Sequence, residues 1–485
     1  MSQKNDVASL EPQHLWAAFA ALNEVPRPSK KEERVTEFAR KFGESLGLET
    51  LTDGVGNVLI RKPASAGMES RPTVVMQAHL DMVHQKNSGT KFDFDKEGIR
   101  MLVEGDWVRA DGTTLGADNG IGVASIMAVL QSSDMKHPAI EALFTIDEET
   151  GMTGAKKLKG DWLTGKILLN LDTEEDTDLT IGCAGGVDVS TAAGYEEEAA
   201  AIGTKGLKIA ISGLTGGHSG MEIHLGRGNA NKLMNRLLHV LTTRLNARIH
   251  SIEGGGLRNA VPRESVAVLS VGEKDVAAIE KTVAELTAVL KHEYAATDPG
   301  LKIQVEQVAN LAKVMKPSAQ QNLLSCIDGV LSGIWRMSPS IPDLVQTSNN
   351  LARVVVANGK IDLQCLTRSS VDTERDELAR ILLSVFAVLG GKLETAGEYP
   401  GWQPEPESGI VELMSGLYTK MFGDAPRVAA CHAGLECGII GSHYPGMEMI
   451  SFGPNIKGAH SPDEKVQISS VQKYWKYLTA TLAGL

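Results

Sequence analysis

The sequence predicts a two-domain α/β protein, in which a domain built on a mixed or parallel sheet is interrupted by an inserted ferredoxin-like α+β domain. Three observations support this prediction. The chain has 485 residues, which is too many for one ordinary hydrophobic core. As far as residue 186, short apolar runs alternate with helical stretches, as they do in α/β units. Beyond that point the predicted order becomes strand, helix, strand, strand, helix, strand, which is the split ferredoxin-like arrangement.

These changes of pattern set the expected domain boundaries. Residues 1–186 and 398–485 form the two parts of the α/β domain, and residues 187–397 form the insert. The proline-rich segment YPGWQPEP at 399–406 is typical of a link between domains. The insert is about twice as long as one βαββαβ unit, and its second half repeats helices and strands less regularly, which favours an internal duplication.

The α/β domain begins with two predicted helices and a strand. Residues 10–22 have a helical pattern, which Pro26 and Pro28 end because proline cannot continue the hydrogen-bond ladder. Apolar residues then recur at helical spacing between 35 and 46, so one face of a second helix is buried. Glycine and asparagine at 54–57 mark a turn before a strand at 58–61.

Four later apolar runs each lead to histidine or acidic residues. The runs are 74–78 before His79, 140–146 before Asp147-Glu148-Glu149, 166–171 before Asp172, and 447–452, which leads through a Gly-Pro-Asn loop to His460. Runs of this length and composition suit buried strands. If the strands are parallel, the residues just beyond their carboxyl ends line one crevice, so we expect these side chains to lie together.

Asp118 lies in the glycine-flanked segment LGADNG at 115–120, where a loop enters an apolar helix. Aspartate is a good helix N-cap, so capping is the simpler interpretation of this residue alone. The glycines on both sides favour a close approach of the backbone to another group, which capping does not require.

In the insert, the expected elements follow a regular order. The strands are 207–212, 247–253, 264–271 and 301–308, and the helices are 229–245 and 276–294. A second series has helices near 319–331 and at 373–389, and strands at 352–356, 360–367 and 392–395.

Composition excludes several classes of partner. With 42% hydrophobic and 22% charged residues the chain is that of a soluble globular protein, and its net charge of −12 argues against a nucleic-acid or anionic-membrane partner. The N-terminus lacks a signal-peptide pattern, and no apolar run approaches eighteen residues. The five cysteines form no CxxC pair, which favours reduced thiols in the cytoplasm and leaves only nitrogen and oxygen ligands for a metal.

Two histidines and three carboxylates can hold two divalent cations if one carboxylate bridges them. The candidates here are His79, Asp118, Glu149, Asp172 and His460. Imidazole and carboxylate without thiolate suit zinc, with manganese or cobalt as substitutes, so we expect two Zn²⁺ per chain. Asp81, two residues after His79, is placed to orient the ligating imidazole.

Adjacent Glu148 and Glu149 can divide two tasks between them. An acidic run is usually a solvated charge cluster, but a position directly after an apolar strand weighs against that reading here. If Glu149 binds a cation, Glu148 is left beside the metal-activated water as the natural general base. Such a site hydrolyses, because zinc lowers the pKa of its water from about 15.7 toward ~7. Glu148 would accept the proton of that water and pass it to the leaving amine.

Several motifs together resemble the M20 family of metallopeptidases over essentially the whole chain. They are PRPS at 26, AHLDMV at 78, TLGADNGIG at 114, DEETGMTGA at 147, LNLDTE at 169, GGHSG at 216, RNAVPRE at 258, HAGLECG at 432 and GAHSPDE at 458. The resemblance implies a dipeptidase that cleaves unblocked dipeptides of broad type, including Xaa-His compounds such as carnosine. Aminoacylase or tripeptidase action by the same site is an alternative, and a non-catalytic peptide-binding protein is another, although a binder has no need of Glu148.

The resemblance also implies roles for individual residues. One zinc would be held by His79, Asp118 and Asp172, and the other by Asp118, Glu149 and His460, with Asp81 as the orienting acid and Glu148 as the base. For substrate binding, His218 matches a histidine of the family's lid domain that helps to hold the carbonyl oxygen. Arg368 and Asn259 match lid residues that recognise the substrate's C-terminal carboxylate, although Arg368 could equally be a surface strand residue. His432 and Glu436 would shape the pocket.

The resemblance implies a homodimer, but the size of the insert leaves one point open. Simpler relatives have a lid of one βαββαβ unit that dimerises and donates its histidine to the partner's site. A duplicated lid could imitate that dimer within one chain, so His218 could act in its own chain or in the partner.

Overall fold

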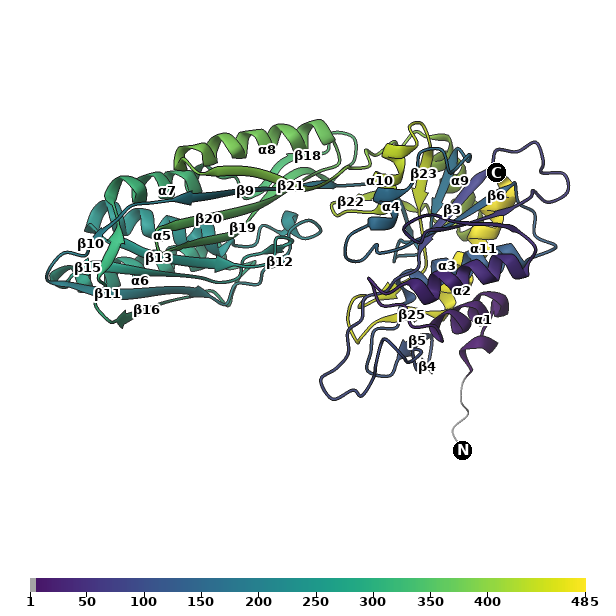
Figure 1. Cartoon of the computed structure of the whole chain (residues 1–485), viewed down its shortest axis with the longest axis horizontal. Helices are drawn as coiled ribbons and strands as arrows, with labels where there is room; N and C mark the ends of the chain where they lie inside the picture. The colour runs from purple at the N-terminus through teal and green to yellow at the C-terminus, as the bar shows by residue number, and fades with distance from the viewer. Residues whose placement is uncertain (1–5) are drawn as a thin grey trace. The chain divides into compact units, whose positions relative to one another are not determined.

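The computed structural model describes residues 6–485, which divide into two compact units (Figure 1). The first unit comprises the chain up to Gly182 together with Trp402–Ala430 and Leu435–Leu485. The second comprises Cys183–Gly401 and Cys431–Gly434. The expected boundaries after residues 186 and 397 thus lie four residues away from those of the structure, in part because the strands at Gly185–Gly194 and Lys392–Tyr399 extend beyond them. The piece Cys431–Gly434 joins the second unit because Ala184 N–H donates to the carbonyls of Cys431 and Ala433, at 3.2 and 2.9 Å.

The first unit is built on a mixed sheet. In spatial order its strands are β1 (Glu49–Thr52), β2 (Val58–Lys62), β6 (Ile140–Thr145), β3 (Val74–His79), β7 (Ile167–Asn170), β23 (Glu448–Ser451), β8 (Asp178–Cys183) and β22 (Arg427–Cys431). Strand β3 is parallel to β6 and β7, and β7 is parallel to β23, whereas β1, β2 and β6 pair in antiparallel fashion. Every residue of β3 and β6 is buried, as expected for central strands covered on both faces.

Helices surround this sheet. They are α1 (Gln13–Asn23), α2 (Glu33–Ser45), α3 (Ala117–Gln131), α4 (Thr153–Lys157), α9 (Gly409–Phe422), α10 (Glu436–His443) and α11 (Ile468–Gly484), preceded by a short 3-10 turn at Val7–Ser9. Helix α3 is apolar on all sides because it packs between β3 and α1 (Figure 1). No helix among residues 6–485 is both long enough and apolar enough to cross a membrane.

A small antiparallel sheet also belongs to the first unit. Its order is β24 (Ile456–Lys457), β25 (Lys465–Gln467), β5 (Trp107–Ala110) and β4 (Met101–Glu104). The segment between β24 and β25 carries His460, and this sheet therefore fixes both ends of that segment.

The second unit contains two ferredoxin-like motifs in one continuous sheet. The first motif has the chain order β11 (Thr204–Ser212), α5 (Ala230–Leu245), β13 (Arg248–Gly255), β15 (Ser265–Gly272), α6 (Val276–Glu293) and β16 (Lys302–Val308). The second has the order β9 (Gly185–Gly194), α7 (Pro317–Gly329), β19 (Val345–Ala357), β20 (Lys360–Ser369), α8 (Asp372–Phe386) and β21 (Lys392–Tyr399). The expected duplication is present, but the first strand of the second motif precedes the whole first motif in the chain.

The two motifs have the same spatial order and meet at equivalent strands. The sheet runs β16-β11-β15-β13-β19-β20-β9-β21, so in each motif the strands lie in the order fourth, first, third, second counted from its outer edge. The second strands, β13 and β19, pair antiparallel from Ile252 opposite Val356 to Gly255 opposite Arg353. Short strands complete the unit: β18 (Gly333–Met337) beside β19, β10 (Glu197–Ala199) with β17 (Lys313–Met315), and β12 (Gly217–His218) with β14 (Ala260–Val261).

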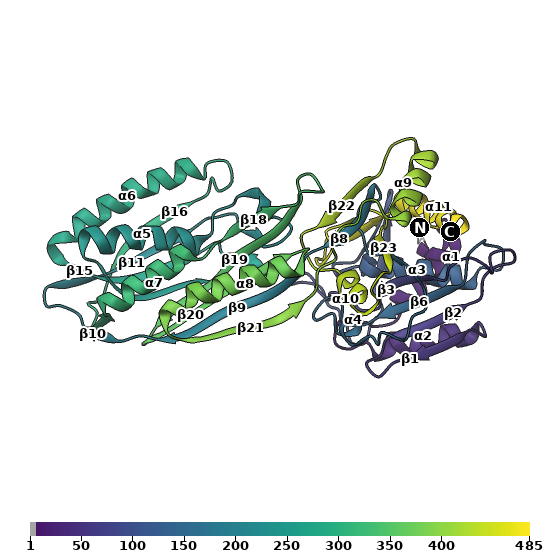
Figure 2. The ribbon, with the colours of Figure 1, turned by 90° about the horizontal axis from the view of Figure 1, so that it is seen from above.

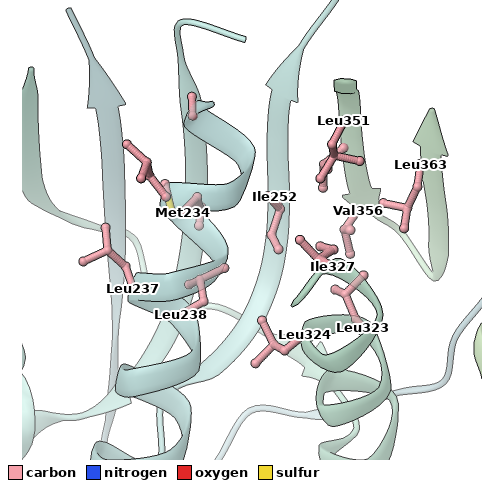
Figure 3. Close-up of a cluster of buried hydrophobic side chains, with 14 of the residues drawn as sticks. Met234, Leu237, Leu238, Ile252, Leu323, Leu324, Ile327, Leu351, Val356 and Leu363 are labelled. Atoms are coloured by element: carbon pink, nitrogen blue, oxygen red, sulfur yellow. The ribbon is translucent and has the colours of Figure 1, made fainter. Parts of the chain in front are cut away.

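The core of the second unit lies between this sheet and helices α5 to α8, which run along one of its faces (Figure 2). Met234, Leu237 and Leu238 of α5 and Leu323, Leu324 and Ile327 of α7 belong to the same hydrophobic cluster as Ile252, Leu351, Val356 and Leu363 of the strands (Figure 3). All of these side chains are buried. Truncating one such leucine to alanine typically costs about 2–5 kcal/mol.

Candidate metal centre

The parallel strands of the first unit bring three ligand candidates to one edge of its sheet. His79 is the last residue of β3 and lies opposite Thr145, the last residue of β6. Gln77 of β3 lies opposite Asn170, the last residue of β7. Glu149 and Asp172 therefore follow their strands at the edge where β3 ends, because the carboxyl ends of parallel strands share that edge.

The predicted ligands gather in two groups that share one aspartate. The first group is His79, Asp118 and Asp172, the second is Asp118, Glu149 and His460, and within each group the ligand atoms lie within 4.8 Å of one another. Asp118 Oδ1 is 3.1 Å from His79 Nε2, while Asp118 Oδ2 is 3.1 Å from His460 Nε2. Each carboxylate oxygen of Asp118 thus faces a different histidine, which is the arrangement that a bridging ligand requires.

The spacing and charge of these groups fit divalent cations. His79 Nε2 is 3.5 Å from Asp172 Oδ1, and His460 Nε2 is 3.0 Å from Glu149 Oε2. Ligands bonded at about 2.0–2.1 Å around a tetrahedral ion lie roughly 3.3 Å apart, close to these values. Hydrogen bonds to Asp118 and Glu149 raise the pKa of His460 to about 11, so this place strongly favours positive charge. Glu149 Oε1 is buried with no hydrogen-bond partner among the described residues, which a cation would supply.

Asp81 is buried between His79 and the turn after β6. Its Oδ1 lies 3.5 Å from His79 Nδ1 and accepts from the Glu148 N–H at 3.0 Å, and its Oδ2 accepts from Ser29 Oγ at 2.8 Å. Burial opposes ionisation of Asp81, but hydrogen bonds from His79, Glu148 and Ser29 outweigh it and lower its pKa. The carboxylate therefore stays charged and fixes both the imidazole and the turn that carries Glu148 and Glu149.

Glu148 lies beside the first ligand group. One of its carboxylate oxygens is within 4.8 Å of ligand atoms of His79 and Glu149, and the side chain remains partly accessible to solvent. Removal from water raises the pKa of Glu148 well above its ordinary value, and the nearby charges of Asp172, Glu436 and Glu149 act in the same direction. A carboxylate in this environment binds a proton readily.

Glu436 belongs to the first unit and is fully enclosed at the ends of β3 and β6. Its Oε2 accepts from Thr145 Oγ1 at 2.6 Å and from Gln77 Nε2 at 2.7 Å. Burial raises the pKa of Glu436 to about 8. The other substrate-binding candidates, His218, Asn259 and Arg368, lie in the second unit.

His218 is held in one tautomer by its own loop. Its Nδ1 accepts from the backbone N–H groups of Gly220 and Met221, at 3.1 and 2.9 Å, so the ring proton is on Nε2. Burial, helped by the charge of Arg368, lowers the pKa of His218 to about 4. His218 is thus a neutral N–H donor. Exposed Asn259 lies next to it, because the Asn259 carbonyl accepts from the Ser219 N–H at 2.8 Å.

Arg368 of β20 is buried, and Nη1 donates to Tyr399 Oη at 2.8 Å. It forms no ion pair with a carboxylate among residues 6–485, and its Nε has no hydrogen-bond partner there. His432 Nε2 is 2.7 Å from Ser348 Oγ. Burial, together with the positive charge of Arg368, lowers the pKa of His432 to about 3. A Cβ at Gly220 would lie 2.1 Å from the His432 carbonyl and 3.1 Å from both Arg368 Nε and His218 Cε1, so the side chains of Arg368 and His218 and the backbone of His432 meet around that glycine.

Three residues that hold these groups in place were not among the sequence candidates. They are Arg27, Glu464 and Tyr399, which contact the backbone near Asp118 or the side chain of Arg368. Arg27 and Glu464 do lie within the motifs PRPS and GAHSPDE, and that position was the available signal.

Comparison with known proteins identifies the family of the chain. The chain matches the model of peptidase family M20/M25/M40 over residues 75–484. The protein belongs to this family and is a metal-dependent peptidase.

Particular relatives are more specific. The chain is 42% identical over 478 residues to the cytosol non-specific dipeptidase of Escherichia coli K12, covering 99% of both chains. It superposes on the crystal structure of aminoacylhistidine dipeptidase from Vibrio alginolyticus with a TM-score of 0.92 and 40% identity, covering 99% of this chain and 98% of that one. The aminopeptidase PepT from Bacillus cereus shares the fold, with a TM-score of 0.57 at 16% identity over 98% of this chain and 99% of that one.

Proposed function

We propose that the protein is a two-zinc dipeptidase that cleaves unblocked dipeptides of broad side-chain type, including Xaa-His dipeptides such as carnosine. The observation that carries this proposal is the pair of ligand groups sharing Asp118, with Glu148 beside them. The 42% identity to a non-specific dipeptidase and the likeness to an aminoacylhistidine dipeptidase support the substrate class.

In this proposal, His79, Asp118 and Asp172 hold one cation, and Asp118, Glu149 and His460 hold the other. Nitrogen and oxygen donors suit zinc, with manganese or cobalt as substitutes. Bound there, the cations would polarise the scissile carbonyl and lower the pKa of the attacking water. Asp81 keeps the imidazole of His79 in the orientation that presents Nε2, because its carboxylate lies beside Nδ1.

Glu148 is the general base in this proposal. Its carboxylate takes a proton from the attacking water and later gives that proton to the leaving amine nitrogen. The raised pKa of Glu148 suits this double role, because a carboxylate of ordinary pKa would hold the proton too weakly to deliver it. Removal of surrounding water, which raises that pKa, therefore also serves the second half of the reaction.

The polar cluster of the second unit would recognise the substrate. Arg368 is a buried cation without a carboxylate partner among residues 6–485, so it would bind the substrate's C-terminal carboxylate, together with Asn259, which lies beside the loop of His218. His218, neutral and carrying its proton on Nε2, would donate to the carbonyl oxygen as negative charge develops there. Glu436 would act from the first unit by fixing the strand ends that carry His79 and the turn after β6.

We further propose that the enzyme works in the cytoplasm as a homodimer. The likeness to a cytosol dipeptidase of Escherichia coli supports the first point, and the family resemblance supports the second. Light scattering on the purified protein would test the assembly, since a monomeric mass at working concentration contradicts it.

A substrate panel tests the reaction itself. Purified protein loaded with Zn²⁺ should hydrolyse free dipeptides, including carnosine, faster than N-acetyl amino acids or tripeptides. Preferred cleavage of an N-acetyl amino acid would assign aminoacylase action instead. No hydrolysis of any peptide by the zinc-loaded protein would contradict the proposal.

A further inference from the structure

One buried carboxylate, that of Glu464, receives hydrogen bonds from four successive backbone N–H groups. Its Oε2 accepts from Leu115 and Gly116 at 2.7 and 2.9 Å, and its Oε1 accepts from Ala117 and Asp118 at 2.8 and 3.2 Å. The four groups converge because Gly116 is left-handed, with φ 70° and ψ 32°. Glu464 thus fixes the backbone of the loop at Asp118, the residue shared by both ligand groups.

A buried guanidinium, that of Arg27, grips the same loop from another side. Its Nη2 donates to the Gly116 carbonyl at 2.5 Å and to Asn23 Oδ1 at 3.1 Å. Its Nη1 donates to the carbonyls of Leu80 and Asp81, each at 3.1 Å. Arg27 therefore ties the loop at Asp118 to the residues directly after His79.

Together the two side chains connect three segments that each supply a candidate ligand. Glu464 lies four positions after His460, on the segment between β24 and β25, and reaches the loop of Asp118. Arg27 joins that loop to the end of β3. Both act on backbone groups rather than on the ligand side chains, so they determine where the chain at Asp118 lies relative to His79 and His460. Gly116 accommodates the contact with Arg27, since a Cβ there would lie 2.5 Å from Arg27 Nη2.

We propose that Glu464 and Arg27 are positioning residues that hold Asp118 between the two histidines before any cation binds. The proposal rests on the proposed role of Asp118 as the shared ligand. If the loop had to be ordered by the cations themselves, part of their binding free energy would be spent on that ordering. A loop already fixed by Glu464 and Arg27 removes that cost for both ions. The competing explanation is that this pair only stabilises the start of α3, as an anion at a helix N-terminus does.

The test compares the cation affinity of variants with that of a matched control. Metal-free wild type, E464Q and R27K are titrated with Zn²⁺ against a chromophoric chelator, and Co²⁺ absorption spectra report the ligand geometry. The control is E141Q, because Glu141 is equally buried in the same unit and also accepts two backbone N–H groups, from Thr164 and Gly165 at 2.8 and 2.9 Å. Glu141 lies near the start of β6, away from the carboxyl ends of the strands where the candidate ligands lie.

We expect E464Q and R27K to bind Zn²⁺ about 10- to 100-fold more weakly than wild type, with altered Co²⁺ spectra. E141Q should lose comparable thermal stability but keep wild-type affinity. Unchanged affinity in a folded E464Q or R27K, or an equal loss in E141Q, would overturn the proposal. If E464Q does not fold, the affinity of R27K alone tests the proposal. Lysine keeps the positive charge but cannot donate both to the Gly116 carbonyl and to the carbonyls of Leu80 and Asp81. The readout is binding, so wild type that binds two ions but cleaves no dipeptide would refute the proposed function alone.

Discussion

Asp118 Oδ2 lies 3.1 Å from His460 Nε2, although the two residues are 342 positions apart in the chain. The contact depends on the small sheet that fixes the segment of His460 and on the loop that fixes Asp118. Since Asp118 also contacts His79, it is the one member common to both ligand groups.

Replacing Asp118 with alanine should remove both cations. The substitution deletes the shared ligand and leaves each group with one histidine and one other carboxylate, which is too few for tight binding. Metal analysis after dialysis should find well under one zinc per chain, while circular dichroism should remain that of a folded protein. Retention of two tightly bound ions by the folded variant would show that Asp118 is not the bridge.

Replacing Glu148 with glutamine should separate catalysis from metal binding. Glutamine keeps the shape but cannot accept a proton, so kcat should fall about 10²- to 10⁴-fold, and KM should change little. The variant should still bind two cations, as measured by metal analysis. If metal content falls with activity, Glu148 is a ligand and the roles of Glu148 and Glu149 are misassigned.

Arg368→Met should raise KM for dipeptides at least about 10-fold, because a charge-assisted hydrogen bond contributes about 1.5–3 kcal/mol. Tyr399→Phe should raise KM less, since it only frees the guanidinium that Tyr399 Oη holds. Neither variant should alter the already weak cleavage of a dipeptide amide, which lacks the carboxylate. Arg353→Met is the matched control, because Arg353 lies on the neighbouring strand β19 and pairs with Asp362 at 2.5 Å. An equal rise in KM in this control would remove the specific role of Arg368.

The buried His432 should make the protein less stable in acid. Its pKa is about 3 when folded, against about 6.5 for an exposed histidine. Between these values the unfolded chain binds a proton that the folded chain does not, so stability falls as pH decreases below about 6.5, by up to about 1.4 kcal/mol per unit. Urea unfolding at pH 7 and pH 5 should therefore show a smaller difference in His432→Gln than in wild type. An unchanged difference, or the same reduction in the exposed-site control His292→Gln, would contradict this assignment.

The sequence predicted most of the strands and helices because their apolar periodicity is strong. The βαββαβ order was readable from residues 207–308, and the observed β11, α5, β13, β15, α6 and β16 differ from the expected elements by a few residues. The interleaving of the second motif was not predicted. Its first strand, β9, precedes the entire first motif, and a strand carries no local mark of the partner with which it pairs.

The site shows the same division. Histidine and acidic residues directly after apolar runs predicted which side chains would meet, since parallel strands share an edge. Asp118 alone resembled a helix N-cap, and only the structure shows its two oxygens facing two histidines. Apart from their position within two motifs, nothing in the sequence marked Glu464 and Arg27, because their partners are backbone groups and any sequence supplies those.

The most direct measurement of the central claim is a zinc titration of chelator-treated protein, with bound metal and dipeptide hydrolysis followed in parallel. We expect hydrolysis to be absent without metal, to return as zinc is added, and to reach its maximum at two ions per chain. Full hydrolysis by the metal-free protein, or saturation of the fully active protein at a single ion, would contradict the account.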